Sequence, residues 1–460
     1  MTVTMYPLRT GKGVQWGDET GTQLVRPNGS SARISESAPA AHTGAIFPIL
    51  PTDATTLWTT DKSASITVSV DFAVTFGGQP SIRIDIPANT SGTLKVGTSG
   101  ANCVVPRSWG LSNAVLAVRY SHADAMPGLT WYLGDSTYTN FWTSSGFSGA
   151  NIPELKPEYD EWIVYKPDAV GGGAVRWSVS AGAPTIAAKM RSKIQWTSAN
   201  VAHDASIWIG AAGVMPSATP TVILSFDDGF STWDSFVKPI AKHYGLPCSF
   251  AISSALVGAA GYLTAAQIQA LHADESGLFD IVNHMVDATG YTVLGASAAY
   301  AQMVACRDYL RGLGVTGDGP LHVPYVSSQY NTDLIELMLS GGFLSARQGT
   351  ASNGWDQRVQ TLAYGDKVRF ELPVCEVPQT GVTVADVQTA VNGVVSSGGV
   401  GFINFHNFAD ADGAYIWAYE KFAELAKWLY DQRAGGTIQI KSWSRWFRDT
   451  AGYGGIGSHS

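Results

Sequence analysis

Residues 221–229 (TVILSFDDG) decide the fold expected for the second half of the chain. The first six are nearly all apolar, which is typical of a parallel strand that is buried on both faces. Helical spacing of apolar side chains follows over residues 229–244, and strands and helices then alternate. The expected strands are 248–252, 279–283, 321–324, 343–346 and 400–405; the expected helices start at 264 and cover 299–313, 333–340, 384–395 and 415–430. This alternation predicts a (β/α) barrel, complete or partial, over residues 221–460.

Residues 46–215 show a different pattern, with apolar side chains at alternate positions and turn-forming residues between short runs. The clearest run, residues 66–76, is expected to bury one face that includes Val70, Phe72 and Val74. Further strands are expected at 81–86, 115–120, 129–133, 162–166, 175–179 and 205–209. Together they predict an antiparallel β-sandwich. Five tryptophans would either pack in its core or form a platform for sugar rings, and both interpretations stay open: Trp131, Trp142, Trp162, Trp177 and Trp196.

Composition excludes several classes of protein. With 29 Lys and Arg against 37 Asp and Glu, the formal net charge is −8, and no basic cluster suggests a nucleic-acid partner. No apolar run is long enough to span a membrane. The cysteines are widely spaced without a CxxC pair, which favours buried free thiols over a zinc–thiolate site: Cys103, Cys248, Cys306 and Cys375. Residues 1–45 are small and polar, and are expected to be an arm or linker that becomes ordered only against a partner or another subunit.

Ionisable side chains follow four of the expected strands. Asp227 and Asp228 follow the first, and His284, Tyr325 and His406 follow three later ones. Because (β/α) barrels carry their catalytic groups at the carboxyl ends of the strands, we expect these side chains to lie together. Taken alone, the Asp pair also allows the alternative of a helix N-cap.

At these residues the last 240 or so positions resemble the NodB-type polysaccharide deacetylases, carbohydrate esterase family 4. Residues 225–229 (SFDDG) match the family's Thr/Ser-Phe-Asp-Asp-Gly, 244–250 (YGLPCSF) its Gly-Ile-Pro-Ala-Thr-Phe, and 403–406 (INFH) its Leu-x-x-His. Two motifs are kept in part. Ala288 replaces the second His of His-Ser/Thr-x-x-His, and His322 replaces the Arg of Arg-x-Pro-Tyr-Gly. The acidic motif that binds this Arg has no clear counterpart, although Glu376 lies near its place.

The resemblance implies a metal-dependent hydrolase that removes N- or O-acetyl groups from a polysaccharide. Asp228 and His284 would hold one divalent cation, with zinc expected first and manganese, cobalt, nickel or magnesium as alternatives. Asp227 would be the general base on metal-activated water, and the Tyr325 N–H would stabilise the oxyanion. His406 would protonate the leaving amine or alcohol.

The altered second motif leaves the cation one ligand short. Asp287, three residues after His284, is the nearest side chain with an oxygen, and is predicted to be the third ligand. The alternative is that Asp287 caps a turn before Gly290. The departures also keep a second function open, namely a glycan-binding receptor protein with a weak or inactive deacetylase domain.

A polar arm and a β-sandwich ahead of such a domain, with no signal sequence at residues 1–16, resemble bacteriophage tail-spike or tail-fibre proteins. The resemblance implies a homo-oligomer, expected as a trimer, in the virion tail beside other tail proteins. Its substrate would be an acetylated bacterial capsule or O-antigen. A secreted enzyme is the alternative.

Overall fold

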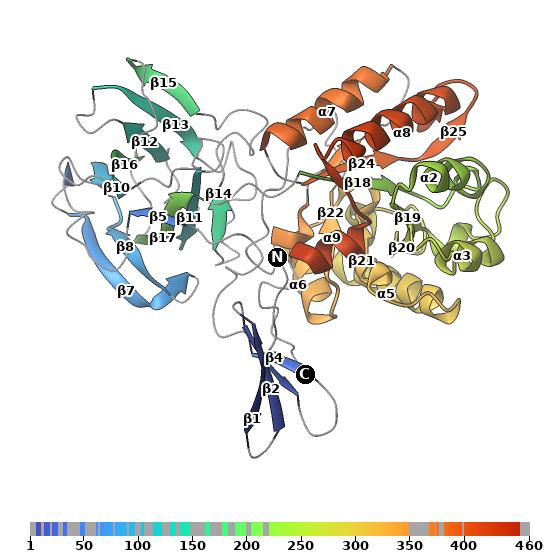
Figure 1. Cartoon of the computed structure of the whole chain (residues 1–460), viewed down its shortest axis with the longest axis horizontal. Coiled ribbons are helices and arrows are strands. Elements are labelled where there is room, and N and C mark those ends of the chain that lie inside the picture. The colour runs from blue at the N-terminus through green and yellow to red at the C-terminus, as the bar shows by residue number, and fades with distance from the viewer. Residues whose placement is uncertain are drawn as a thin grey trace.

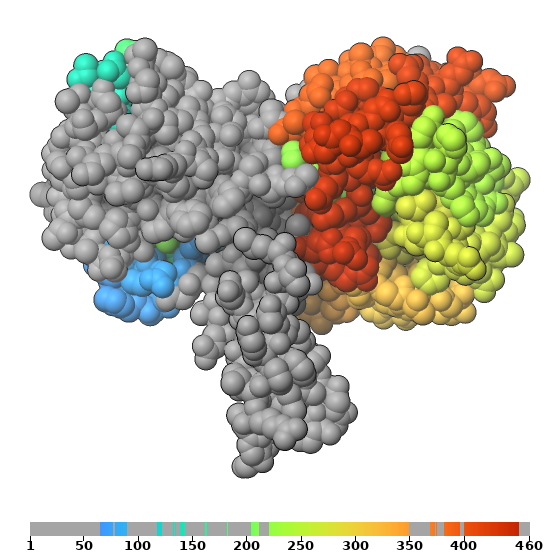
Figure 2. Space-filling view, viewed as in Figure 1, coloured from blue at the N-terminus to red at the C-terminus, as the bar shows by residue number. Residues whose placement is uncertain are grey.

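The computed structural model of the chain describes residues 220–348, 368–372, 374–376, 381–397 and 400–450 of the second half, and shorter stretches, mainly strands, before residue 215. In the described residues, Figure 1 shows strands in the first half, and strands surrounded by helices in the second. In Figure 2 the described part of the second half, coloured from green to red, forms one continuous body. In the described residues no helix is both long and apolar enough to cross a bilayer.

A parallel sheet in the order β20-β19-β18-β24-β23 forms the centre of the second half. Its strands are β18 (Thr221–Phe226), β19 (Cys248–Ile252), β20 (Phe279–Asn283), β23 (Val374–Glu376) and β24 (Val400–Phe405), and β27 (Gln439–Ile440) pairs with the start of β18. β18 is buried along its whole length, as its apolar sequence predicts.

Two further strands, β21 (His322–Pro324) and β22 (Ser345–Arg347), form a parallel pair in which Pro324 lies opposite Arg347. The N–H of Leu372, two residues before β23, donates to the Ala346 carbonyl of β22. This bond joins β22 to the segment that leads into β23. The strands thus follow one another in the cyclic order of a (β/α) barrel. In the described residues β20 and β21 share no ladder, although the Asn283 side chain donates to the Pro320 carbonyl (3.3 Å). Closure into a barrel stays a prediction.

The helices of this half largely follow the expected pattern. The capping box of Thr264 and Gln267 opens α3, with both reciprocal hydrogen bonds present. A π-helical turn, Trp233–Val237, precedes α2, whose first turn contains Pro239 and whose end is the left-handed Gly245 (φ 63°). The helices are α2 (Lys238–Tyr244), α3 (Ala265–His272), α4 (Tyr291–Leu294), α5 (Ala296–Gly312), α6 (Thr332–Ser340), α7 (Val384–Ser397), α8 (Tyr419–Ala434) and α9 (Trp443–Thr450).

The predicted start of one helix is wrong. Residues 415–430 were expected to be helical throughout, but α8 begins at Tyr419. The residues before it form β26 (Ile416–Ala418), which pairs in parallel with β25 (Asn407–Ala409). Because residues 416–418 form backbone hydrogen bonds with β25, they do not join the first turn of the helix.

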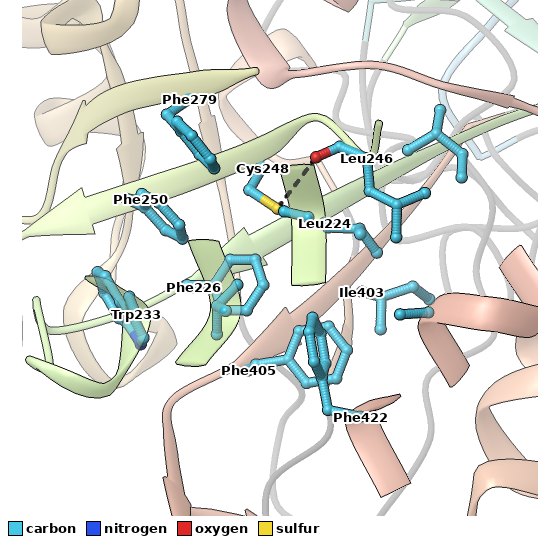
Figure 3. Close-up of a cluster of buried hydrophobic side chains, with 14 of the residues drawn as sticks. Leu224, Phe226, Trp233, Leu246, Cys248, Phe250, Phe279, Ile403, Phe405 and Phe422 are labelled. Atoms are coloured by element: carbon cyan, nitrogen blue, oxygen red, sulfur yellow. Dashed lines mark hydrogen bonds between the residues drawn. The ribbon is translucent and has the colours of Figure 1, made fainter. Parts of the chain in front are cut away.

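Aromatic side chains fill the core between the sheet and the helices. Phe226 from β18 stacks on Phe405 from β24, with ring centroids 5.2 Å apart, and meets Phe250 edge-on at the same distance. Figure 3 shows these rings with Trp233 and Phe422 in one cluster. The Cys248 thiol lies in the same cluster and donates to the Leu246 carbonyl. Burial of this cluster fixes the strand ends from which the polar residues project.

Two of the four cysteines can be assessed in the described structure. Cys248 and Cys306 are free and buried, as predicted. Burial raises the pKa of the Cys306 thiol to about 12, so this thiol stays protonated at neutral pH. The side chains of Cys103 and Cys375 lie outside the described residues.

The first half contains two larger antiparallel sheets, in the orders β15-β13-β12-β16-β9-β6 and β14-β11-β17-β8-β7. Every strand that was expected has a counterpart, and the sequence pattern missed β5, β6, β9, β10, β13 and β16. The strands are β5 (Phe47–Leu50), β6 (Asp61–Lys62), β7 (Thr67–Phe76), β8 (Gln79–Ile86), β9 (Gly92–Val96), β10 (Cys103–Val104), β11 (Ala114–Tyr120), β12 (Leu129–Gly134), β13 (Phe141–Phe147), β14 (Ile163–Tyr165), β15 (Trp177–Ala181), β16 (Lys189–Ser198) and β17 (Ala205–Val214). Their packing as a sandwich stays a prediction.

The strand with the clearest alternation does not bury all of its apolar side chains. The β7–β8 register shifts between Asp71 and Thr75, and Phe72 is 75% exposed. The Asp71 carboxylate accepts hydrogen bonds from the N–H groups of Ala73 and Val74 (2.8 and 3.0 Å). A bulge therefore interrupts the two-residue period, and the prediction that Phe72 is a core residue is wrong.

The polar N-terminal stretch is not only an arm. A four-stranded antiparallel sheet in the order β1-β2-β3-β4 occupies much of residues 1–45. Its strands are β1 (Tyr6–Thr10), β2 (Gly13–Asp18), β3 (Gly21–Val25) and β4 (Ser31–Ile34). Each strand pairs with its neighbour in sequence, so adjacent short strands form a meander that the polar composition concealed.

Candidate active site

The adjacent carboxylates of Asp227 and Asp228 follow β18 directly. The Asp227 N–H donates to the Phe405 carbonyl of β24 (2.9 Å), which prolongs the ladder by one residue. The chain then turns sharply, because Asp228 has φ 86° and Gly229 has φ 95°. Such backbone is costly for a residue with a side chain, and residues of this kind gather at functional sites. The turn separates the two side chains: Asp227 is buried, while Asp228 is about a quarter exposed.

His284 lies at the end of β20 and faces Asp228. Its Nε2 atom is 3.4 Å from Asp228 Oδ1, and its Nδ1 atom is 3.0 Å from the Pro324 carbonyl oxygen. A carbonyl only accepts, so Nδ1 carries the hydrogen and Nε2 points toward the carboxylate. The Ser253 hydroxyl donates to the His284 carbonyl (3.1 Å) and fixes the backbone. Burial lowers the pKa of His284, but Asp227 and Asp228 outweigh burial, and the net pKa is raised.

Asp227 is held by side chains from two other strands. Arg347 of β22 forms a buried ion pair with its Oδ1 atom, and the Asn404 side chain of β24 donates to its Oδ2 atom (3.2 Å). The same guanidinium also donates to Asn404 Oδ1 (2.8 Å) and Ser225 Oγ (3.1 Å). Burial raises the pKa of Asp227, but Arg347, His284 and His406 outweigh burial, so its pKa lies below the usual range. Asp227 is therefore an ionised, oriented carboxylate.

Sequence reasoning missed Arg347. The resembling motif places an Arg two residues before Pro324, where this chain has His322. That histidine is buried, bonds to Ser345 Oγ (2.9 Å) and stacks on Trp443. Arg347 lies on the neighbouring strand, opposite Pro324. The only signal that could have found it is the parallel pairing of β21 with β22, which is not visible along one segment of sequence.

The role expected for the Tyr325 N–H is not supported. This N–H donates to the Arg347 carbonyl (2.9 Å), so it extends the β21–β22 ladder and does not point to a reacting group. The Tyr325 ring is buried and stacks on Tyr330 at a centroid distance of 4.8 Å. In this structure the Tyr325 ring packs in the interior and its N–H belongs to the ladder, which does not support the predicted oxyanion role.

His406 follows β24, as predicted, and is half-buried. Its carbonyl accepts a hydrogen bond from the indole of Trp233 (2.8 Å), a fully buried residue, so its backbone is fixed. Phe226 and Phe405 are register partners in the β18–β24 ladder, so Asp227 and His406, which follow them, lie at neighbouring strand ends. The Tyr415 ring lies 4.9 Å from the imidazole, centroid to centroid. Asp227, Asp228, His284 and His406 therefore gather at one end of the strands.

Asp287 is not brought to this group. Its carboxylate accepts a hydrogen bond from the Thr289 N–H (2.8 Å) and a longer one from Gln302 (3.4 Å), so it caps a turn. Those bonds lower the pKa of Asp287. In the part of the chain that the structure describes, no three His, Cys, Asp or Glu side chains form a metal-binding group. The turn-capping alternative describes Asp287 in this structure, and its prediction as a ligand is not supported.

Two side chains are nevertheless suited to bind a divalent cation. A carboxylate and an imidazole are ordinary zinc ligands, and metal-binding histidines commonly donate their other N–H to a backbone carbonyl, as His284 does to Pro324. Asp228 and His284 therefore fit two ligand positions.

The comparisons with known proteins give remote similarities. No family model matches the sequence, and no curated protein matches it. Solved structures that resemble about half of the chain include a putative polysaccharide deacetylase from Mycobacterium smegmatis (14% identity, TM-score 0.35, covering 52% of this chain and 92% of that one). Others are the CE4 domain of a xylanase from the hindgut metagenome of Trinervitermes trinervoides (14%, 0.34, 51% and 92%) and a family 4 acetyl xylan esterase from Clostridium thermocellum (17%, 0.32, 49% and 90%). At these identities and TM-scores the similarities support no functional argument, so function must be argued from the site itself.

Proposed function

We propose that the second half of the chain is a hydrolase that removes acetyl groups from a polysaccharide, with a divalent cation held by Asp228 and His284. The orientation of His284 is the observation that supports this proposal most directly, because Nδ1 is bonded to a carbonyl and Nε2 faces a carboxylate. A cation such as zinc, when bound, would polarise the acetyl carbonyl and lower the pKa of water.

The remaining steps belong to side chains of the protein. Asp227 accepts a proton from the attacking water, and Arg347 and Asn404 keep its two oxygens in place. His406, at the end of the neighbouring strand, donates a proton to the leaving nitrogen or oxygen of the sugar. Base and acid thus directly follow the adjacent strands β18 and β24, and water is the nucleophile.

Acetate release tests the proposal. The protein, loaded with zinc, should release acetate from penta-N-acetylchitopentaose or acetylated xylan and lose this activity after chelation. Asp227→Asn should reduce the rate at least about 10²-fold, the scale of a lost general base. Asp274→Asn, a carboxylate paired with Lys242 on the surface, is the matched control. Activity that survives chelation or Asp227→Asn would refute the assignment.

A second candidate is a glycan-binding protein with weak or no catalysis. Two observations favour it: the Tyr325 N–H is engaged in a ladder, and Asp287 caps a turn. Calorimetry with the same oligosaccharides distinguishes the two functions, because a receptor binds them and releases no acetate even with zinc present.

We also propose the setting that the architecture suggests, a trimeric phage tail protein acting on an acetylated capsule or O-antigen. Light scattering of the full chain tests the oligomeric state, and a monomer mass near 49 kDa would contradict it.

A further inference from the structure

Tyr415 is an exposed aromatic residue in an unusual conformation. Its side chain is 52% exposed, and its φ is 56°, in the left-handed region that bulky side chains rarely adopt. Strained positions of this kind persist where the surrounding structure imposes them, and they cluster at functional sites.

The surroundings of Tyr415 fix it in place. Its carbonyl accepts a hydrogen bond from the Asn407 N–H (3.0 Å), directly after His406. Gly413 and Ile416, on either side of it, exchange two backbone hydrogen bonds (3.0 and 3.1 Å). The Asp412 carboxylate accepts from the Ala418 N–H (2.9 Å) and pairs with Lys421. The loop is therefore anchored to β26 and α8, and these contacts fix the backbone that carries the Tyr415 ring.

The position beside His406 determines which part of a substrate the ring would meet. A general acid protonates the leaving group, and in a deacetylation the leaving group is the sugar. The Tyr415 ring lies 4.9 Å from the His406 ring, inclined at 58°, so it borders the sugar side of the reacting bond. The apolar CH face of a pyranose packs well on an exposed aromatic ring.

We propose that Tyr415 is a substrate-binding and specificity residue that stacks on the pyranose ring that carries the acetyl group. This inference rests on the proposed function of His406. It gives the site a preference for acetyl groups on sugar rings over acetyl groups on flexible alcohols.

The test compares two substrates in one assay. Acetate release is measured with penta-N-acetylchitopentaose and with triacetin, an acetyl ester without a ring. Tyr415→Asn removes the ring, and Asn tolerates the left-handed backbone. It should lower the ratio of kcat/KM for the oligosaccharide to that for triacetin on the order of tenfold, mainly through KM. Tyr415→Phe should keep the wild-type ratio. Tyr309→Asn, at an exposed tyrosine of α5, is the matched control.

A binding measurement separates this inference from the proposed function. Calorimetry with penta-N-acetylchitopentaose uses the full chain after chelation, with and without Tyr415→Asn. If the wild-type protein releases no acetate but Tyr415→Asn weakens binding about tenfold, the proposed function fails and the stacking role stands. An unchanged ratio and unchanged binding, or no binding of the oligosaccharide at all, would overturn the stacking role.

Discussion

Arg347 and Asp227 form an ion pair that is almost completely buried, with side-chain exposures of 1% and 7%. Arg347 ends β22 and Asp227 directly follows β18, and in the described part of the chain these two strands do not pair with each other. The guanidinium reaches Asp227 while it also bonds to Ser225 and Asn404, so one arginine joins three strands at the base of the site. Removal of either member would leave a buried charge without its partner.

Arg347→Met should therefore destabilise the protein by about 3–5 kcal/mol, the cost typical of a broken buried pair. Arg347→Met combined with Asp227→Asn should recover most of the loss, because no carboxylate charge remains buried. Denaturant unfolding of the four proteins in this cycle measures the coupling. Arg307→Met, which breaks a partly exposed pair with Asp308, should change little. A double variant no more stable than Arg347→Met would contradict this account.

Asp287→Ala should leave zinc binding unchanged. Its carboxylate caps the turn at Thr289, so the expected cost is about 1 kcal/mol of stability. His284→Ala, in contrast, should lower the zinc content, since the imidazole is one of the two donors. Metal analysis after dialysis measures the zinc content of both variants. Loss of zinc from Asp287→Ala would instead make this residue the third ligand after a rearrangement of the turn.

Stability should fall as the pH is lowered through the titration range of His322. Burial, aided by the charges of Arg448 and Arg369, lowers the pKa of His322 to about 3, from 6.5 in the unfolded chain. Between these values the unfolded state binds a proton that the folded state does not, so stability decreases with decreasing pH, by at most about 1.4 kcal/mol per pH unit. The slope should be absent above pH 6.5 and end near pH 3.

His322→Asn should flatten this slope, because the amide still reaches Ser345 but does not titrate. Urea unfolding between pH 7 and pH 4 measures the slope. His272→Asn, at a histidine that bonds to Thr316 on the surface, is the control. Equal slopes in the wild type and in His322→Asn would show that other groups cause the acid sensitivity.

Because of the bulge in β7, alanine substitutions of two apolar residues in one sheet should have different effects on stability. Phe72 is 75% exposed, so Phe72→Ala should change stability by less than about 0.5 kcal/mol. Ile82 on β8 is fully buried, and Ile82→Ala should cost about 2–5 kcal/mol. Thermal unfolding of both variants checks the difference. A large loss of stability from Phe72→Ala would contradict the bulge and show that Phe72 is buried, as the alternating sequence pattern predicts.

The sequence predicted the parts of the fold that depend on local pattern. The buried run of β18, the capping box at Thr264 and the stop at Gly245 are each determined by residues that are neighbours in the chain. The sequence also placed Asp227, Asp228, His284 and His406 together, because strand ends of one sheet meet at one edge.

One feature was missed because of a side-chain bond between near neighbours, and the others because they depend on how strands pair. Phe72 lies outside the core because the Asp71 side chain caps two backbone N–H groups and shifts the register. Tyr415 looks helical by spacing, yet the residues that follow it pair with the strand after His406. The Tyr325 N–H and the Arg347 guanidinium both depend on how β22 aligns with β21.

The register of Pro324 opposite Arg347 makes the site sensitive to the length of a segment that contains no catalytic motif. Arg347 reaches Asp227 only while β22 keeps its present alignment, and a shift by one residue turns alternate side chains to opposite faces. One residue inserted or deleted between α6 and β22 would therefore leave every motif intact and still separate Asp227, the proposed general base, from the Arg347 guanidinium.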